Sequence, residues 1–138
     1  MARKSMNASQ HTNRRMNDDV YKLRRKVMDC IYEAKKVVIL PRIDVRITDC
    51  DDRHVLGTAR MGDNIIWIPA ETLTRSPLEI RHVVFHEICH AAFNTEHDSE
   101  CPLMAPVISK TTKEQQDNAL MKHAVHTPQR EHSVECAK

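Results

Sequence analysis

The stretch SPLEIRHVVFHEICHAAFN, residues 76–94, decides how this chain is expected to fold. It opens with serine, then proline, then a glutamate three residues after the serine, which is the pattern of a capping box with proline at the first helical position. The helix is predicted to run to about Phe93, and Asn94 suits the left-handed conformation that ends a helix. Its broad apolar surface predicts a position deep in the domain. The residues that form this surface are Leu78, Val84, Phe85, Ile88, Ala91 and Ala92.

The chemistry of this helix lies in the five residues 86–90, HEICH. Four residues make about one helical turn, so His86 and His90 project from one face, and Zn²⁺ accepts imidazole nitrogens at about 2.0–2.1 Å. Glu87 points slightly aside, where it can take a proton from a water molecule that the metal activates. Histidines buried without a partner would be costly, which favours a metal site over a structural pair. The pattern therefore predicts a zinc site with Glu87 as the general base.

A third ligand is expected just beyond the end of the helix. If Asn94 turns the chain back, His97 approaches the ion from the other side. A third imidazole leaves the ion its full positive charge, whereas a carboxylate would lower it. We therefore favour His97, with Glu96, Asp98 and Cys101 as the alternatives.

This arrangement resembles the zincin metallopeptidases, and within them the metzincin-like branch, whose motif H-E-x-x-H-x-x-G-x-x-H is followed by a methionine turn. The likeness covers residues 43–106 and places Met104 at the methionine turn. Phe93 stands where that branch has its glycine, and His97 falls one residue later than its third histidine. The His97-Asp98 pair is also similar to the sites of WLM-type proteases, which act on DNA-linked proteins. The resemblance implies a zincin-like fold, a Zn²⁺ cofactor and a peptide or protein substrate.

One helix and three strands are predicted before residue 76. Asn17 is a plausible N-cap for the helix, because acidic residues follow it and an apolar stripe recurs at three- and four-residue spacing. That stripe comprises Val20, Leu23, Val27, Ile31 and Ala34. Residues 43–48 alternate with the two-residue period of a strand, and the strands 55–61 and 65–68 are joined across a turn at residues 62–64. The resemblance makes 55–61 the antiparallel edge strand that binds extended peptide, with an ordinary hairpin as the alternative.

Together these elements predict an α+β fold in one small domain, with a short mixed sheet packed on the buried helix. The domain is expected over residues 17–126, including a third helix that starts at Thr111 or Thr112. Residues 1–16 are expected to form a disordered basic tail and residues 127–138 a disordered C-terminal tail.

Charge and hydropathy bear on the partners. Residues 1–26 carry a net charge of +6 and the remainder about −4, so the basic end offers a weak contact for nucleic acid, although a solubilising role is the simpler interpretation. The sequence has no apolar run of the roughly 18–20 residues that span a bilayer and no signal-peptide core, which predicts a cytoplasmic protein without a membrane partner. The five cysteines include no C-x-x-C pair, so neither a disulfide framework nor a zinc finger is indicated.

Three classes of function are compatible with these features. The favoured one is a metallopeptidase, in which the metal polarises the scissile carbonyl and Glu87 activates water. The second is a metal-binding regulatory or DNA-associated protein of the same fold with weak catalysis. The third is a nucleic-acid-binding module with a structural metal, which would have no use for a base beside its ligands.

Overall fold

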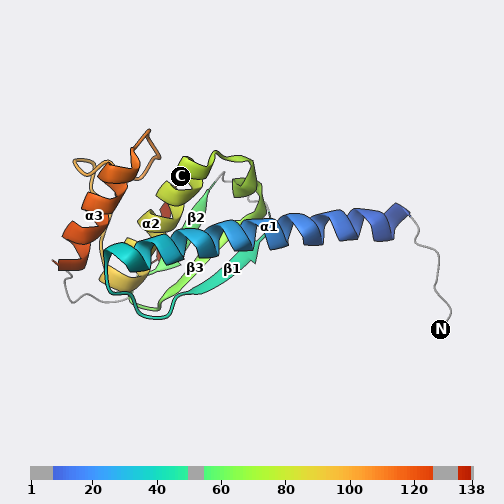
Figure 1. Ribbon diagram of the computed structural model, residues 1–138, viewed down its shortest axis with the longest axis horizontal. Helices are drawn as coiled ribbons and strands as arrows, with labels where there is room; N and C mark the ends of the chain where they lie inside the picture. Colours follow the sequence, from blue (N-terminus) through green and yellow to red (C-terminus); the bar gives the residue numbers. More distant parts are fainter. Residues whose placement is uncertain (1–7, 50–54, 126–133, 138) are drawn as a thin grey trace.

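The computed structural model describes residues 8–49, 55–125 and 134–137 of the chain, with side chains described for 18–49 and 55–125. The elements follow one another as α1 (Ala8–Val37), β1 (Asp44–Thr48), β2 (Gly57–Arg60), β3 (Ile65–Pro69), a short 3₁₀ helix η1 (Ala70–Thr74), α2 (Pro77–Phe93), α3 (Lys113–Val125) and β4 (Val134–Ala137). Figure 1 shows the strands gathered beside the helices, with α1 running along the longest axis. The α+β class with a mixed sheet is confirmed.

The four described strands form one sheet in the order β1-β3-β2-β4. β1 pairs with β3 in parallel, whereas β2 pairs antiparallel with both β3 and β4. The turn between β2 and β3 has positive φ at Gly62 (82°) and Asn64 (58°), two residue types that tolerate the left-handed region.

The prediction that residues 55–61 form an edge of the sheet is wrong, because β4 covers that side of β2. Val134–Ala137 lie inside the segment expected to be a disordered tail. Val134–Ala137 has only four residues, the lower limit of the length at which an alternating pattern identifies a strand. Residues 127–133 and 138 of that expected tail lie outside the described residues.

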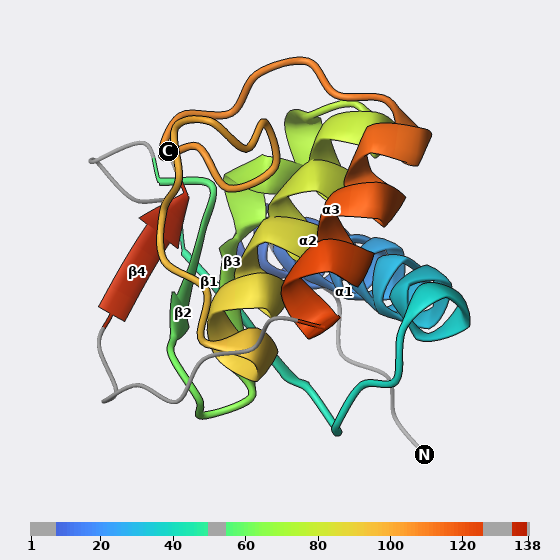
Figure 2. The same cartoon turned by 90° about the vertical axis from the view of Figure 1, so that its left-hand side faces the viewer.

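Helix α2 forms the centre of the fold, as predicted. The Ser76 side chain accepts a hydrogen bond from the Glu79 amide, and the Glu79 side chain accepts one from the Ser76 amide, so the capping box is complete. At the other end Asn94 is left-handed, with φ 52°. In Figure 2, α2 lies between the sheet and α3, and α1 contacts both α2 and β1. Thirteen of its residues are buried, which makes it a rigid support for any side chain that it presents.

A buried arginine joins α2 to the other two helices. Arg81 donates to Asp117 on α3 at 2.7 Å, to Gln116 on α3 at 2.9 Å and to Glu33 on α1 at 3.4 Å, and its guanidinium lies over the Phe85 ring. A desolvated charge needs partners of this kind, and these partners fix the position of α2 between α1 and α3.

Helix α1 begins at Ala8, so the predicted N-cap at Asn17 is wrong. Residues 8–16 contain neither glycine nor proline, and a helix already formed over the following residues propagates through such a segment. The predicted apolar stripe does face the core, with Leu23, Val27 and Ala34 fully buried. Figure 1 shows the N-terminal part of α1 extending beyond the rest of the fold; residues 1–7 lie outside the described part. None of the described helices has the combination of length and apolar character required to cross a bilayer.

Candidate metal centre

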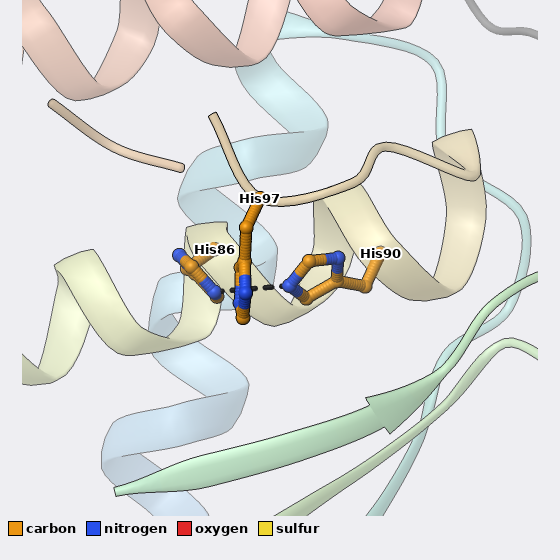
Figure 3. A group of neighbouring side chains, drawn as sticks. All are labelled: His86, His90 and His97. Atoms are coloured by element: carbon orange, nitrogen blue, oxygen red, sulfur yellow. Dashed lines mark hydrogen bonds between the residues drawn. The ribbon is translucent and has the colours of Figure 1, made fainter. Parts of the chain in front are cut away.

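Three histidines converge on one point at the surface of α2. His86 and His90 lie one turn apart on this helix, and His97 reaches them from the loop that follows it (Figure 3). Each offers one ring nitrogen, and the three nitrogens lie within 4.8 Å of one another. The ring centroids are separated by 4.6 to 5.1 Å. The three residues predicted as ligands are thus brought together in a cluster that could hold a metal ion.

The end of α2 explains how His97 reaches the other two rings. The left-handed Asn94 reverses the chain, and the amide of Thr95 donates to the carbonyl of Cys89 at 3.0 Å. The loop then closes on itself, since the amide of Asp98 donates to the carbonyl of Met104 at 2.9 Å. This closure holds His97 over the helix.

Backbone carbonyls fix the tautomers of the two helical histidines. His86 Nδ1 donates to the carbonyl of Leu103 at 2.7 Å, and His90 Nδ1 donates to the carbonyl of Thr95. Because a carbonyl oxygen can only accept, each Nδ1 carries the ring proton, and in a neutral ring each Nε2 is left with a lone pair. Backbone carbonyls that accept from the second ring nitrogen are common outer partners of metal-binding histidines.

The Nε2 atoms of His86 and His90 are 3.0 Å apart (Figure 3). Their two lone pairs therefore face each other. Two acceptors at this distance repel unless a positive charge lies between them. Two nitrogens bound tetrahedrally to zinc at about 2.0–2.1 Å are about 3.3 Å apart, which is close to the separation found here. The pair is therefore arranged as a cation receptor.

Burial keeps both rings in the neutral form that a metal needs. Desolvation, reinforced by the neighbouring His90, lowers the pKa of His86 well below its ordinary value, and the Leu103 carbonyl opposes this only in part. Desolvation likewise lowers the pKa of His90 to about 4. Near neutral pH both nitrogens are then free of competing protons.

These shifts predict that the metal-free protein loses stability in mild acid. In the unfolded chain the histidines take up protons near pH 6.5, whereas folded His90 does so only near pH 4. Between these values the unfolded state binds more protons, so stability is full above pH 6.5 and falls as the pH is lowered. For His90 alone the loss from pH 7 to 5 is about 2 kcal/mol. Urea unfolding of EDTA-treated protein at both pH values measures it, and His90→Gln should show a smaller loss. A stability independent of pH over this interval would contradict the assignment.

Glu87 lies on the side of α2 that meets the sheet. The residue is fully buried, and it packs against the first residue of β2. A Cβ added to Gly57 would lie 2.9 Å from Val83 Cγ1 and 3.1 Å from Glu87 Oε2, so only glycine allows the strand to approach the helix this closely. The carboxylate predicted as general base is thus held beside the start of β2.

Gly57→Ala should therefore disturb the carboxylate without removing a metal ligand. The added methyl group must push back Val83 and Glu87, at a cost of about 1–3 kcal/mol in the free energy of unfolding. We expect unchanged binding of added zinc and a lower midpoint of thermal unfolding, both measured on the same preparation. Thr58→Ala, which adds no atom at the next position of the strand, is the matched control. Wild-type stability in Gly57→Ala would show that the contact is not tight.

The alternative third ligands have other surroundings. Cys101 is buried with its Sγ 3.4 Å from His123 Nε2 on α3. Asp98 is exposed and accepts a hydrogen bond from the Glu100 amide at 2.9 Å, so it stabilises its own loop rather than a histidine ring. Glu96 is exposed as well. Among the described residues, the metal-ligand cluster comprises the three histidines alone.

His82 is buried beside the site. Its ring stacks on that of His86 at 6.4 Å, and its Nδ1 lies 2.7 Å from the hydroxyl of Thr111. That hydroxyl also accepts a hydrogen bond from Gln116, a partner of Arg81. One hydrogen-bonded chain thus leads from the buried arginine to the ring behind the metal cluster.

Comparison with known proteins gives no match: no protein family, no curated protein and no solved structure is significantly similar to the chain. The function must therefore be inferred from the histidine cluster and the elements around it.

Proposed function

We propose that the protein is a zinc-dependent metallopeptidase. The observation that carries the proposal is the pair of lone pairs on His86 Nε2 and His90 Nε2, turned toward each other at 3.0 Å by hydrogen bonds on the opposite ring nitrogens. His97 completes a set of three imidazole ligands, whose nitrogens lie within 4.8 Å of one another.

This set of ligands favours zinc over other cations. Imidazole nitrogens suit zinc, whereas magnesium and calcium prefer oxygen. Three protein ligands leave a fourth tetrahedral position open, which is typical of catalytic rather than structural zinc sites. The bound ion would polarise a carbonyl group and acidify a water molecule.

Glu87 supplies the base in this proposal. It is next to His86 in the sequence and buried beside β2. In the proposed reaction it would accept the proton of the attacking water and pass it to the leaving amine. The Nδ1 hydrogen bonds of His86 and His90 keep those rings in the ligand tautomer throughout.

The proximity of β2 to Glu87 supports a peptide as the substrate. A strand whose side is free binds an extended backbone by main-chain hydrogen bonds, and β2, whose outer side pairs with β4, starts in contact with the carboxylate. A peptide paired with β2 would lie close to α2, the helix that bears His86 and His90.

Purified protein should contain about one zinc per chain, and His86→Ala should lose it, because a site with three protein ligands loses much of its affinity with one of them. Elemental analysis under reducing conditions measures the content, and digestion of a peptide library tests turnover. His123→Ala, which leaves the three-histidine cluster intact, is the control and should retain zinc.

The three possible results lead to different conclusions. Zinc with hydrolysis supports the proposal. Zinc without hydrolysis of any peptide would instead support the metal-binding regulator. Protein that binds no zinc would overturn both.

A further inference from the structure

The C-terminal strand occupies the side of β2 that a peptide would need. β4 pairs antiparallel with β2 over its full length, with Gly57 opposite Ala137, Thr58 opposite Cys136, Ala59 opposite Glu135 and Arg60 opposite Val134. Figure 2 shows β4 beside β2 at the outer edge of the sheet. The other side of β2 is paired with β3. Both sides of β2 are therefore occupied by the chain itself.

This strand also lies next to the candidate site. Gly57 packs directly against Glu87, and Ala137 is its partner across the ladder. Paired strands are about 4.7–4.9 Å apart, so the backbone of Ala137 is one strand spacing from a residue that contacts the carboxylate. β4 accordingly contacts α2 as well as β2.

We propose that Val134–Ala137 is an intramolecular occupant of the peptide-binding edge, and that a peptide substrate must displace it to pair with β2. This inference rests on the proposed peptidase function and adds a form of regulation to it. The protein is held in an inhibited form until the C-terminal strand leaves, and the rate of hydrolysis depends on how often it does.

The length and the pairing of β4 make it easy to displace. It has four residues, one fewer than a common strand, and among the described strands it pairs with β2 alone. Its main-chain hydrogen bonds are of the same kind as those that an incoming extended peptide would make. A longer peptide can therefore compete with it.

The first test breaks the ladder in the full-length chain. Glu135→Pro together with Cys136→Pro removes a ladder amide from β4, because neighbouring antiparallel pairs alternate between bonded and non-bonded. Glu135→Ala with Cys136→Ala is the matched control that keeps both amides. We expect the amides of Gly57–Arg60 that point toward β4 to exchange hydrogen at least tenfold faster in the proline variant than in the alanine variant.

The same two variants are compared for peptide binding and turnover. A fluorescein-labelled peptide EHSVECAK, the sequence of residues 131–138, should bind the proline variant at least tenfold more tightly, as measured by fluorescence polarisation. Hydrolysis of the peptide library should be at least tenfold faster. Equal amide exchange and equal peptide affinity in the two variants would overturn the inference. Faster exchange and tighter binding without hydrolysis in any variant would support the occupied edge and overturn the peptidase.

A second variant remains informative if the proline variant does not fold. Thr58 lies opposite Cys136, and antiparallel partners are about 4.5–5.5 Å apart at Cα, within the range for a disulfide. Thr58→Cys, oxidised with glutathione disulfide, should lock β4 in place and bind the labelled peptide at least tenfold more weakly than after reduction with a phosphine. Thr58→Cys with Cys136→Ser cannot form this bond and should not respond. Equal peptide binding by the locked and reduced forms would overturn the inference.

Discussion

Glu87→Gln is expected to keep zinc and fold while lowering the rate of peptide hydrolysis by about 10²–10⁴-fold, the usual contribution of a general base. Glutamine has nearly the same shape, so the contact with Gly57 is retained, but its amide cannot accept the proton of the attacking water. Steady-state hydrolysis of a fluorogenic peptide, with zinc content measured on the same sample, tests this directly.

The matched control is Glu100→Gln, which changes an exposed carboxylate of the loop after α2 and should retain the full rate. If Glu87→Gln were as active as this control, Glu87 would not be the base, and the buried carboxylate would have a structural role.

His97→Ala should lower zinc affinity by at least about a hundredfold, since losing even an outer partner of a ligand typically costs 10–100-fold and this change removes a ligand itself. The remaining His86 and His90 hold the ion from one helix only. Competition with a chromophoric chelator measures the change.

Cys101→Ser is the control for this experiment, because the Cys101 thiol lies against His123 and a serine there removes a potential zinc ligand without changing the histidines. Unchanged affinity is expected. Retention of zinc by His97→Ala together with its loss in Cys101→Ser would mean that the thiol, and not the imidazole, is the third ligand.

The sequence predicted the elements whose signals are local. Ser76 and Asn94 determine where α2 begins and ends through hydrogen bonds within a few residues, and both act as expected. The same is true of α3, where Thr112 and Gln115 form a reciprocal cap. The spacing of His86 and His90 follows from the helical period alone, so these two were brought together as soon as the helix was recognised.

The features that the sequence did not predict depend on long-range backbone contacts. The carbonyls of Thr95 and Leu103 set the histidine tautomers, yet every residue has a carbonyl and no side chain marks these two. The approach of Gly57 to Glu87 joins residues 30 positions apart. The pairing of β4 with β2 joins still more distant segments, and the four residues of Val134–Ala137 are too short a run to identify a strand by pattern alone.

The two carbonyls that orient the histidines lie at opposite ends of one loop, at Thr95 and Leu103, and His97 lies between them. The length of this loop is thus a dimension of the metal site: a residue inserted or deleted between these positions would turn at least one imidazole away from the ion. In diverging descendants of this chain, we expect insertions to accumulate elsewhere, while the distance in sequence from His90 to Leu103 stays constant. The spacing would then identify relatives in which almost nothing else is recognisable.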